Sequence, residues 1–139
     1  MMRLFVSMAF TCLTLGLTAC QSTGSTVDGK THQYTLTQKC PALLEIDQGE
    51  VIMVTLPENP STGYQWQLAK PITLLKTEET YLAGEAKAGM VGVPGKKIFK
   101  FTAEKLGQDE IHLVYVRPWE VKDSSMQGVE QWQCRVRIS

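Results

Sequence analysis

The strongest constraint on the fold is a strict alternation of apolar and polar residues near the C-terminal end of the chain. From Glu130 to Ser139 the sequence reads EQWQCRVRIS. Every second side chain in this run is apolar or a cysteine: Trp132, Cys134, Val136 and Ile138. A period of two is typical of a β-strand that buries one face, because successive side chains point to opposite sides of a sheet. The segment therefore predicts a half-buried strand.

Similar runs recur along the chain. The alternation is repeated at residues 64–68, 99–103 and 111–115. Residues 50–56 are apolar and β-branched on both faces, as in a central strand, and weaker strand signals lie at 32–37 and 72–82. No window shows a sustained helical stripe or a fixed repeat. About seven or eight short strands predict an all-β fold, an antiparallel β-sandwich, with a closed barrel as the alternative.

The composition fits one globular domain. The chain has 139 residues, of which 43% are hydrophobic and 20% are charged, as in folded rather than disordered proteins. Basic and acidic residues both number 14, so the basic surplus of a nucleic-acid binder is absent. His32 and His112 show no metal-ligand spacing, and no Cys-x-x-Cys pair occurs. We therefore expect no nucleic acid, metal or cofactor, and a monomer.

The first nineteen residues predict an export signal. Arg3 is followed by fourteen uncharged residues, 4–17, which is shorter than the roughly 20 apolar residues of a membrane span. The segment ends Leu17-Thr18-Ala19-Cys20, which resembles the lipobox of bacterial lipoproteins. A plain secretory cleavage site is the alternative.

The lipobox resemblance implies that Cys20 is lipidated and becomes the mature N-terminus. Gln21 follows in place of Asp, which in Gram-negative cells implies sorting to the outer membrane of the bacterial envelope. Residues 21–31, QSTGSTVDGKT, predict a flexible tether with an r.m.s. span of roughly 17–20 Å. We accordingly divide the chain into a signal peptide (1–19), a lipidated cysteine with its tether (20–32) and a folded domain (33–139).

Two cysteines, Cys40 and Cys134, lie within the predicted domain. An exported compartment permits a disulfide between them. The bridge would tie the first strand to the last and, in the chain-entropy model, stabilise the fold by ~4–5 kcal/mol. Two buried free thiols are the alternative, and we favour the bridge.

Three connections differ from the short loops of ordinary hairpins. Residues 56–64 hold two prolines and a glycine, so this loop is restricted before it binds anything. Residues 89–95 are apolar and glycine-rich, which allows close approach to another backbone. Residues 116–120 place an arginine and a tryptophan beside a proline, and both residue types are frequent interface hot spots. Each loop alone is consistent with an ordinary turn, but together they predict a binding edge at one end of the sandwich.

The three loops resemble the signature motifs of the chagasin family of cysteine-peptidase inhibitors. Asn59-Pro60-Ser61-Thr62-Gly63-Tyr64 is similar to the pattern NPTTGY, with Ser61 replacing the first threonine and losing only its methyl group. Gly92-Val93-Pro94-Gly95 matches the family's glycine loop, and Arg117-Pro118-Trp119 matches its RPW motif. The motifs occur in the family's order, and the resemblance covers roughly residues 33–139.

The resemblance implies an immunoglobulin-like β-sandwich that reversibly inhibits papain-like cysteine peptidases. It places residues 59–64 over the catalytic thiolate and imidazolium, with Ser61 and Thr62 nearest. It places residues 92–95 along the substrate-strand site and Trp119 on an aromatic surface beside the cleft. Arg117 either makes polar contacts or braces its loop. Tyr64, like Trp66, begins the next strand and is expected to serve mainly the core.

Other classes of function are compatible with parts of the sequence. An enzyme would use Ser61 with His32 or His112, but no catalytic motif surrounds that serine, and we assign no catalytic residue. A module of the cell envelope that binds carbohydrate or cell wall is the stronger rival, because β-sandwiches with exposed tryptophan often serve that purpose. A purely structural lipoprotein is the third alternative.

Overall fold

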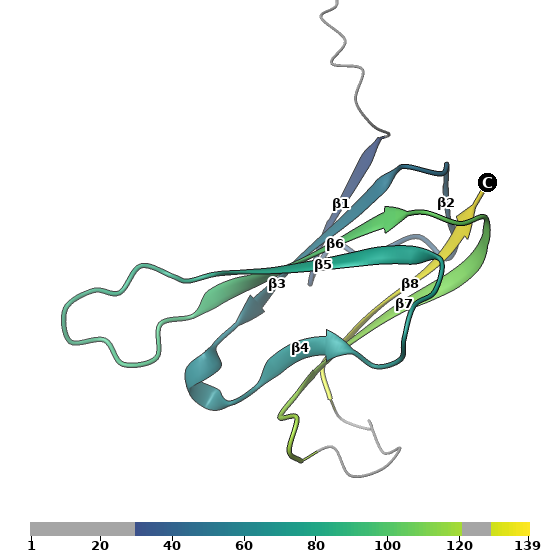
Figure 1. Ribbon diagram of the computed structural model, residues 1–139. Helices are drawn as coiled ribbons and strands as arrows, with labels where there is room; N and C mark the ends of the chain where they lie inside the picture. The colour runs from purple at the N-terminus through teal and green to yellow at the C-terminus, as the bar shows by residue number, and fades with distance from the viewer. Residues whose placement is uncertain (1–29, 121–128) are drawn as a thin grey trace, which may run out of the picture.

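The computed structural model describes residues 30–120 and 129–139, which form two facing β-sheets and one short 3₁₀ turn (Figure 1). The predicted immunoglobulin-like β-sandwich is confirmed, with four strands in each sheet. The elements in chain order are β1 (Thr31–Thr35), β2 (Leu44–Ile46), β3 (Val51–Glu58), η1 (Pro60–Thr62), β4 (Gln65–Leu68), β5 (Leu75–Leu82), β6 (Gly95–Ala103), β7 (Gly107–Val116) and β8 (Gln131–Ile138).

The two sheets differ from a purely antiparallel sandwich at one edge each. Sheet A has the order β1-β3-β6-β5, and sheet B has the order β2-β8-β7-β4. The inner pairs are antiparallel, but β1 pairs with β3 and β2 pairs with β8 in parallel. The two exceptions, β1 and β2, are the first two strands of the chain, and each lies at the edge of a different sheet. A parallel partner needs a long connection, so no turn signal in the sequence marks it.

The core lies between the sheets and is formed by the apolar faces that the alternation predicted. The face of β8 is buried as expected, with exposed residues between its apolar ones. In β6, Phe99 and Phe101 are fully buried, and in β3 the same holds for Ile52, Val54 and Leu56. Each such side chain stabilises the fold by about 1.5–3 kcal/mol relative to an exposed one. The outer face of β3 is only half-buried, so the strand is central in its sheet but not covered on both sides.

Strand β3 extends two residues beyond the predicted segment 50–56 and includes Pro57 and Glu58. Proline is rare in central strands because it has no N–H to donate. The N–H of Val51 points toward β1, where it donates to the carbonyl of Lys30, and alternate residues of a strand point the same way. The backbone nitrogen of Pro57 therefore also faces the side of β1, but β1 pairs with β3 only as far as Thr55. Its missing N–H therefore costs no ladder bond.

A disulfide joins Cys40 to Cys134, with Cα atoms 5.4 Å apart, as the favoured prediction required. Cys134 is buried in β8, whereas Cys40 lies in the connection between β1 and β2 and not in a strand. The bridge therefore ties the crossing from sheet A to sheet B to the last strand. It does not tie the first strand itself.

The chain enters sheet A at the end of the molecule opposite to η1. β1 begins at Thr31 and runs parallel to β3, which leads directly into η1 (Figure 1). Thr31, which the sequence placed in the tether, is thus part of the sheet, and the strand signal predicted from His32 corresponds to β1. Cys20 and the predicted signal peptide lie outside the described residues. Within residues 30–120 and 129–139, no helix has the length and apolar character needed to span a membrane.

Candidate functional site: three loops at one end of the sandwich

The three predicted loops converge at one end of the sandwich (Figure 1). We call residues 59–64 the NPSTGY loop, residues 92–95 the glycine loop and residues 117–119 the RPW loop. Strand register explains the convergence, because Glu58 pairs with Gly95 and Gln65 pairs with Val116. The NPSTGY loop thus crosses from sheet A to sheet B, with the glycine loop beside its start and the RPW loop beside its end.

The NPSTGY loop is held in shape by its own hydrogen bonds. Asn59 caps η1, since its side-chain oxygen accepts from the N–H of Ser61 at 3.2 Å. The carbonyl oxygen of Asn59 accepts from both the N–H and the hydroxyl of Thr62, at 3.2 and 2.8 Å. The Thr62 hydroxyl in turn accepts from the N–H of Tyr64 at 3.2 Å. The hydroxyl predicted to lie nearest the target therefore also maintains the loop.

Gly63 closes the turn and lies directly beneath Trp119. Its φ is +79°, a left-handed conformation that favours glycine, and its N–H donates to the carbonyl of Pro60 at 3.0 Å. A Cβ atom at this position would lie 2.5 Å from Cη2 of Trp119. The glycine is thus required both by the backbone and by the indole that packs on it.

The NPSTGY loop contacts the glycine loop through Asn59. The Asn59 side-chain nitrogen donates to the carbonyl of Gly92 at 3.1 Å. Gly92 has φ +75°, and a Cβ atom there would approach the Cβ of Ser61 to 3.3 Å. The two loops are therefore in direct contact and linked by one amide side chain.

The RPW loop is joined to the NPSTGY loop through Arg117. The Arg117 Nε donates to the carbonyl of Thr62 at 3.1 Å, and its guanidinium carbon lies 4.5 Å from the ring centre of Tyr64. The same side chain forms an ion pair with Glu120 at 3.1 Å. Of the two roles expected for Arg117, bracing the loop is the one these contacts favour.

The predicted site residues fall into an exposed set and a supporting set. Trp119 is 65% exposed, and three neighbours at the tips are also exposed: Pro60, Ser61 and Thr62. Pro94 and Pro118 are exposed as well, whereas Val93 is half-buried and Gly95 is buried in β6. Trp66 is 1% exposed, which confirms its place in the core. Tyr64 is half-buried and packs against Tyr115, with the two rings tilted and their centres 5.4 Å apart.

Two further residues belong to the loop end although the sequence did not single them out. Glu58 is buried, and its carboxylate accepts from the N–H of Trp66 at 2.7 Å. The hydroxyl of Tyr115 accepts from the N–H of Asn59 at 3.3 Å. Glu58 carried a weak signal, since a glutamate stands beside a proline at the end of an apolar strand. Tyr115 carried none beyond its strand alternation.

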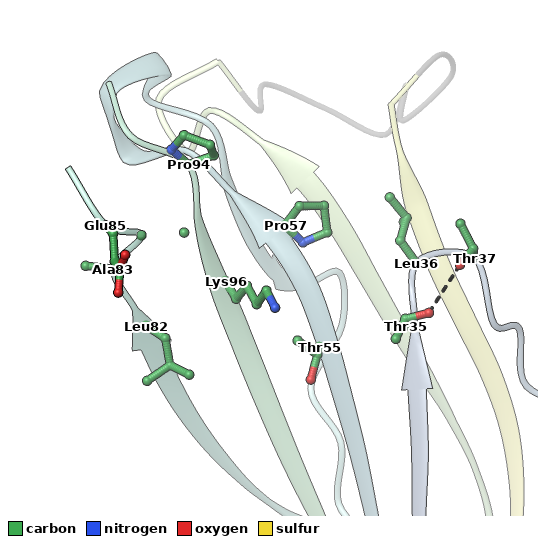
Figure 2. A pocket seen from close by; sticks show the side chains of 12 residues that line it. Thr35, Leu36, Thr37, Thr55, Pro57, Leu82, Ala83, Glu85, Pro94 and Lys96 are labelled. Atoms are coloured by element: carbon green, nitrogen blue, oxygen red, sulfur yellow. Dashed lines mark hydrogen bonds between the residues drawn. The ribbon is translucent and has the colours of Figure 1, made fainter. Parts of the chain in front are cut away.

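A groove of about 690 Å³ adjoins the base of the loops on the outer face of sheet A (Figure 2). Its floor includes Thr55 and Pro57 of β3 and Lys96 of β6, and its walls come from the end of β1 and from residues 82–85. Pro94 and Gly95 belong both to the groove and to the glycine loop. The sequence did not predict this groove, because its lining comes from four segments that are far apart in the chain.

Two of the carboxyl groups with a shifted pKa lie in strands, the third directly precedes β3, and none of the three belongs to the three loops. A hydrogen bond from His32 lowers the pKa of Glu50, one from Lys100 lowers the pKa of Glu78, and one from Lys70 lowers the pKa of Glu110. In the ranges that the structure describes, no three His, Cys, Asp or Glu side chains gather as metal ligands. The loop end instead offers a tryptophan, an arginine and exposed hydroxyls, which are groups suited to contact with another macromolecule.

Fold and site together define a class: a β-sandwich that presents connected loops at one end as a binding surface. A family model described as "Chagasin family peptidase inhibitor I42" matches residues 45–132 of the chain. The chain therefore belongs to the chagasin family of peptidase inhibitors. This family consists of peptidase inhibitors and not of enzymes.

Relatives agree in sequence and in fold. Amoebiasin-2 of Entamoeba histolytica is 38% identical over 80 residues, which make up 57% of this chain. The match spans 65% of Amoebiasin-2, just under two thirds of its length. Chagasin of Trypanosoma cruzi is 29% identical over 84 residues, 56% of this chain and 74% of the relative. The crystal structure of a cysteine protease inhibitor from Entamoeba histolytica matches with a TM-score of 0.63 and 30% identity, covering 78% of this chain and 96% of that one.

Proposed function

We propose that the chain inhibits papain-like cysteine peptidases reversibly, with its three loops occupying the active-site cleft. The observation that carries this proposal is the connection among the loops, since Asn59 bonds the glycine loop and Arg117 bonds the NPSTGY loop. A surface assembled before binding loses little conformational entropy when it docks. The similar solved structure from Entamoeba histolytica supports this target class, because that protein is described as a cysteine protease inhibitor.

The NPSTGY loop has the shape of a plug that is difficult to cleave. A papain-like enzyme needs a substrate carbonyl placed beside its thiolate and free to enter the oxyanion hole. Three carbonyl oxygens of this loop are already engaged within the protein, those of Asn59, Pro60 and Thr62. With these oxygens bound, the loop can fill the cleft while withholding its peptide bonds from attack.

The two flanking loops serve as anchors on either side of this plug. The glycine loop follows the substrate-strand site and contributes backbone hydrogen bonds. Trp119 packs on an aromatic surface beside the cleft, with Gly63 behind its indole. We propose that the peptidase-binding residues are the ones predicted from the sequence, with Arg117 mainly holding the NPSTGY loop in place.

Titration of residues 21–139 against papain and a cathepsin tests the proposal, with a serine peptidase as control. We expect reversible inhibition of both cysteine peptidases and none of the control. Binding to peptidoglycan without inhibition of either cysteine peptidase would instead support the envelope-binding alternative.

We also propose that the domain is a monomer anchored to the outer membrane through lipid on Cys20. The support is the lipobox-like sequence Leu17-Thr18-Ala19-Cys20 and the entry of the chain at the end opposite the loops. An anchored domain would then direct its loops away from the lipid surface. Cell fractionation tests the anchor: the Cys20→Ala variant should leave the membrane fraction, and its retention there would contradict lipidation at this site.

A further inference from the structure

Glu58 is the only charged side chain that is buried among the residues the structure describes, with 7% exposure. It is the last residue of β3 and immediately precedes the NPSTGY loop. Burying a carboxylate is costly unless it gains strong hydrogen bonds. The position therefore calls for a structural or functional reason.

The Glu58 carboxylate bridges the two sheets across the base of the loop. Its Oε2 accepts from the backbone N–H of Trp66 at 2.7 Å, and Trp66 belongs to β4 in sheet B. This bond joins the residue before the NPSTGY loop to the second residue after it.

Neighbouring bonds hold the same span. The indole Nε1 of Trp66 donates to the carbonyl of Pro57 at 2.8 Å, and the N–H of Asn59 donates to the hydroxyl of Tyr115 at 3.3 Å. The rings of Trp66 and Tyr115 stack with centres 5.1 Å apart. Three consecutive residues at the entrance of the loop, 57–59, are thus each tied to sheet B.

We propose that Glu58 is a positioning residue for inhibition, which sets the separation of the two ends of the NPSTGY loop. The inference rests on the proposed function and deepens it. With its ends held together, the loop keeps the 3₁₀ turn whose carbonyls are bound within the protein. With its ends released, the loop can extend, and an extended segment in the cleft is a substrate of the peptidase. Glu58 thereby keeps the loop in the form that inhibits, because the released loop would be hydrolysed as a substrate.

Three variants distinguish the hydrogen bond from the charge. Glu58→Gln keeps the length and an acceptor oxygen, Glu58→Asp keeps the charge but shortens the reach, and Glu58→Ala removes both. We expect the inhibition constant for papain to rise at least about tenfold for Glu58→Ala and to stay within about threefold for Glu58→Gln, with Glu58→Asp between them. After prolonged incubation, mass spectrometry should find Glu58→Ala hydrolysed within residues 59–64 and Glu58→Gln intact.

Glu50→Ala provides the matched control. Glu50 is also a shielded glutamate whose carboxylate accepts a backbone N–H, that of Asp47 at 3.3 Å, but it precedes β3 at the opposite end of the strand. Thermal unfolding should show that Glu50→Ala is destabilised, while its inhibition constant and its resistance to cleavage remain those of the unchanged protein. A general loss of stability is thereby separated from a loss of loop geometry.

Amide hydrogen exchange of the free variants separates this inference from the proposed function. Faster exchange at residues 61–64 in Glu58→Ala, with protection restored in Glu58→Gln, is the expected result and needs no peptidase. If the unchanged protein fails to inhibit papain, the proposed function is wrong. Amide hydrogen exchange still tests whether Glu58 holds the two ends of the NPSTGY loop together. Equal inhibition, cleavage and exchange in all three variants would overturn the role of Glu58, as would potency that follows charge, with Glu58→Asp intact and Glu58→Gln cut.

Discussion

The NPSTGY loop and the connection between β5 and β6 lie at the same end of the sandwich but are built in opposite ways. The first contains five hydrogen bonds among its own six residues and is tied to both sheets. The second spans residues 83–94, has one backbone bond from Met90 to Lys87, and leaves Val91 97% exposed. The fold therefore concentrates internal hydrogen bonds in the loop that is proposed to lie over the catalytic thiolate, and provides few in the connection that carries the glycine loop.

The largest expected effect is a matched pair of insertions that breaks this contrast directly. One alanine inserted between Thr62 and Gly63 should abolish inhibition, because it displaces the bonded carbonyls and the glycine beneath Trp119. One alanine inserted between Gly89 and Met90 should weaken inhibition by less than about tenfold, since that segment can absorb the extra residue. Inhibition constants for papain measure both. Equal losses at the two sites would show that the loops do not differ in stiffness.

Trp119→Ala should have the next largest effect. An exposed aromatic anchor contributes about 2 kcal/mol or more, so inhibition should weaken at least about tenfold. Thermal unfolding should change little, because the indole is 65% exposed. If the inhibition constant is unchanged, Trp119 does not belong to the contact surface.

Substitution of Asn59 sharpens the comparison by uncoupling the two loops. Asn59→Asp keeps the oxygen that accepts from Ser61 but loses the nitrogen that donates to Gly92, whereas Asn59→Ala loses both. A cap or a hydrogen bond of this kind contributes about 1 kcal/mol, so we expect roughly fivefold weaker inhibition for Asn59→Asp and a larger loss for Asn59→Ala. Surface plasmon resonance measures both. Identical losses would mean that the bond to the glycine loop contributes nothing.

The smallest effect concerns acid stability at the end of the molecule opposite both loops. The hydrogen bond from His32 holds the pKa of Glu50 below its ordinary value of 4.5. The ionised Glu50 therefore stabilises the folded state at pH values above 4.5. This stabilisation is lost as the pH falls through the lower pKa of Glu50 in the folded state. In Glu50→Gln, the free energy of unfolding should decrease less between pH 6 and pH 3, by about 1 kcal/mol or less. Urea unfolding over this pH range measures the difference. A change in papain inhibition at neutral pH would contradict the separation of the two ends.

Sequence periodicity predicted the inner part of the fold because burial there is one-sided. The alternation at residues 99–103, 111–115 and 131–138 survives as strands of the core. The motif residues of the three loops could be named in advance because prolines, glycines, arginine and tryptophan restrict or define a loop locally. Their convergence follows from pairing registers that only the folded structure supplies.

Other features had no local signal. β2 has three residues, too few for a period to be visible, and its partner β8 lies about ninety positions away. Glu58 fell within the proline-containing loop at residues 56–64, and nothing in the sequence showed that its side chain is buried. Its burial depends on Trp66, whose N–H it accepts from across the sandwich. Interactions between segments distant in the chain are the part that sequence pattern alone could not provide.

The place of β8 has a consequence for the order of folding. This strand sits between β2 and β7, so sheet B remains divided until the last residues of the chain are available. Pairings of such long sequence separation form slowly, because the closure of a large loop must precede them. A nascent chain that lacks β8 cannot join β2 to β7 and so cannot complete sheet B. Synthesis must therefore reach the last strand before the molecule matures.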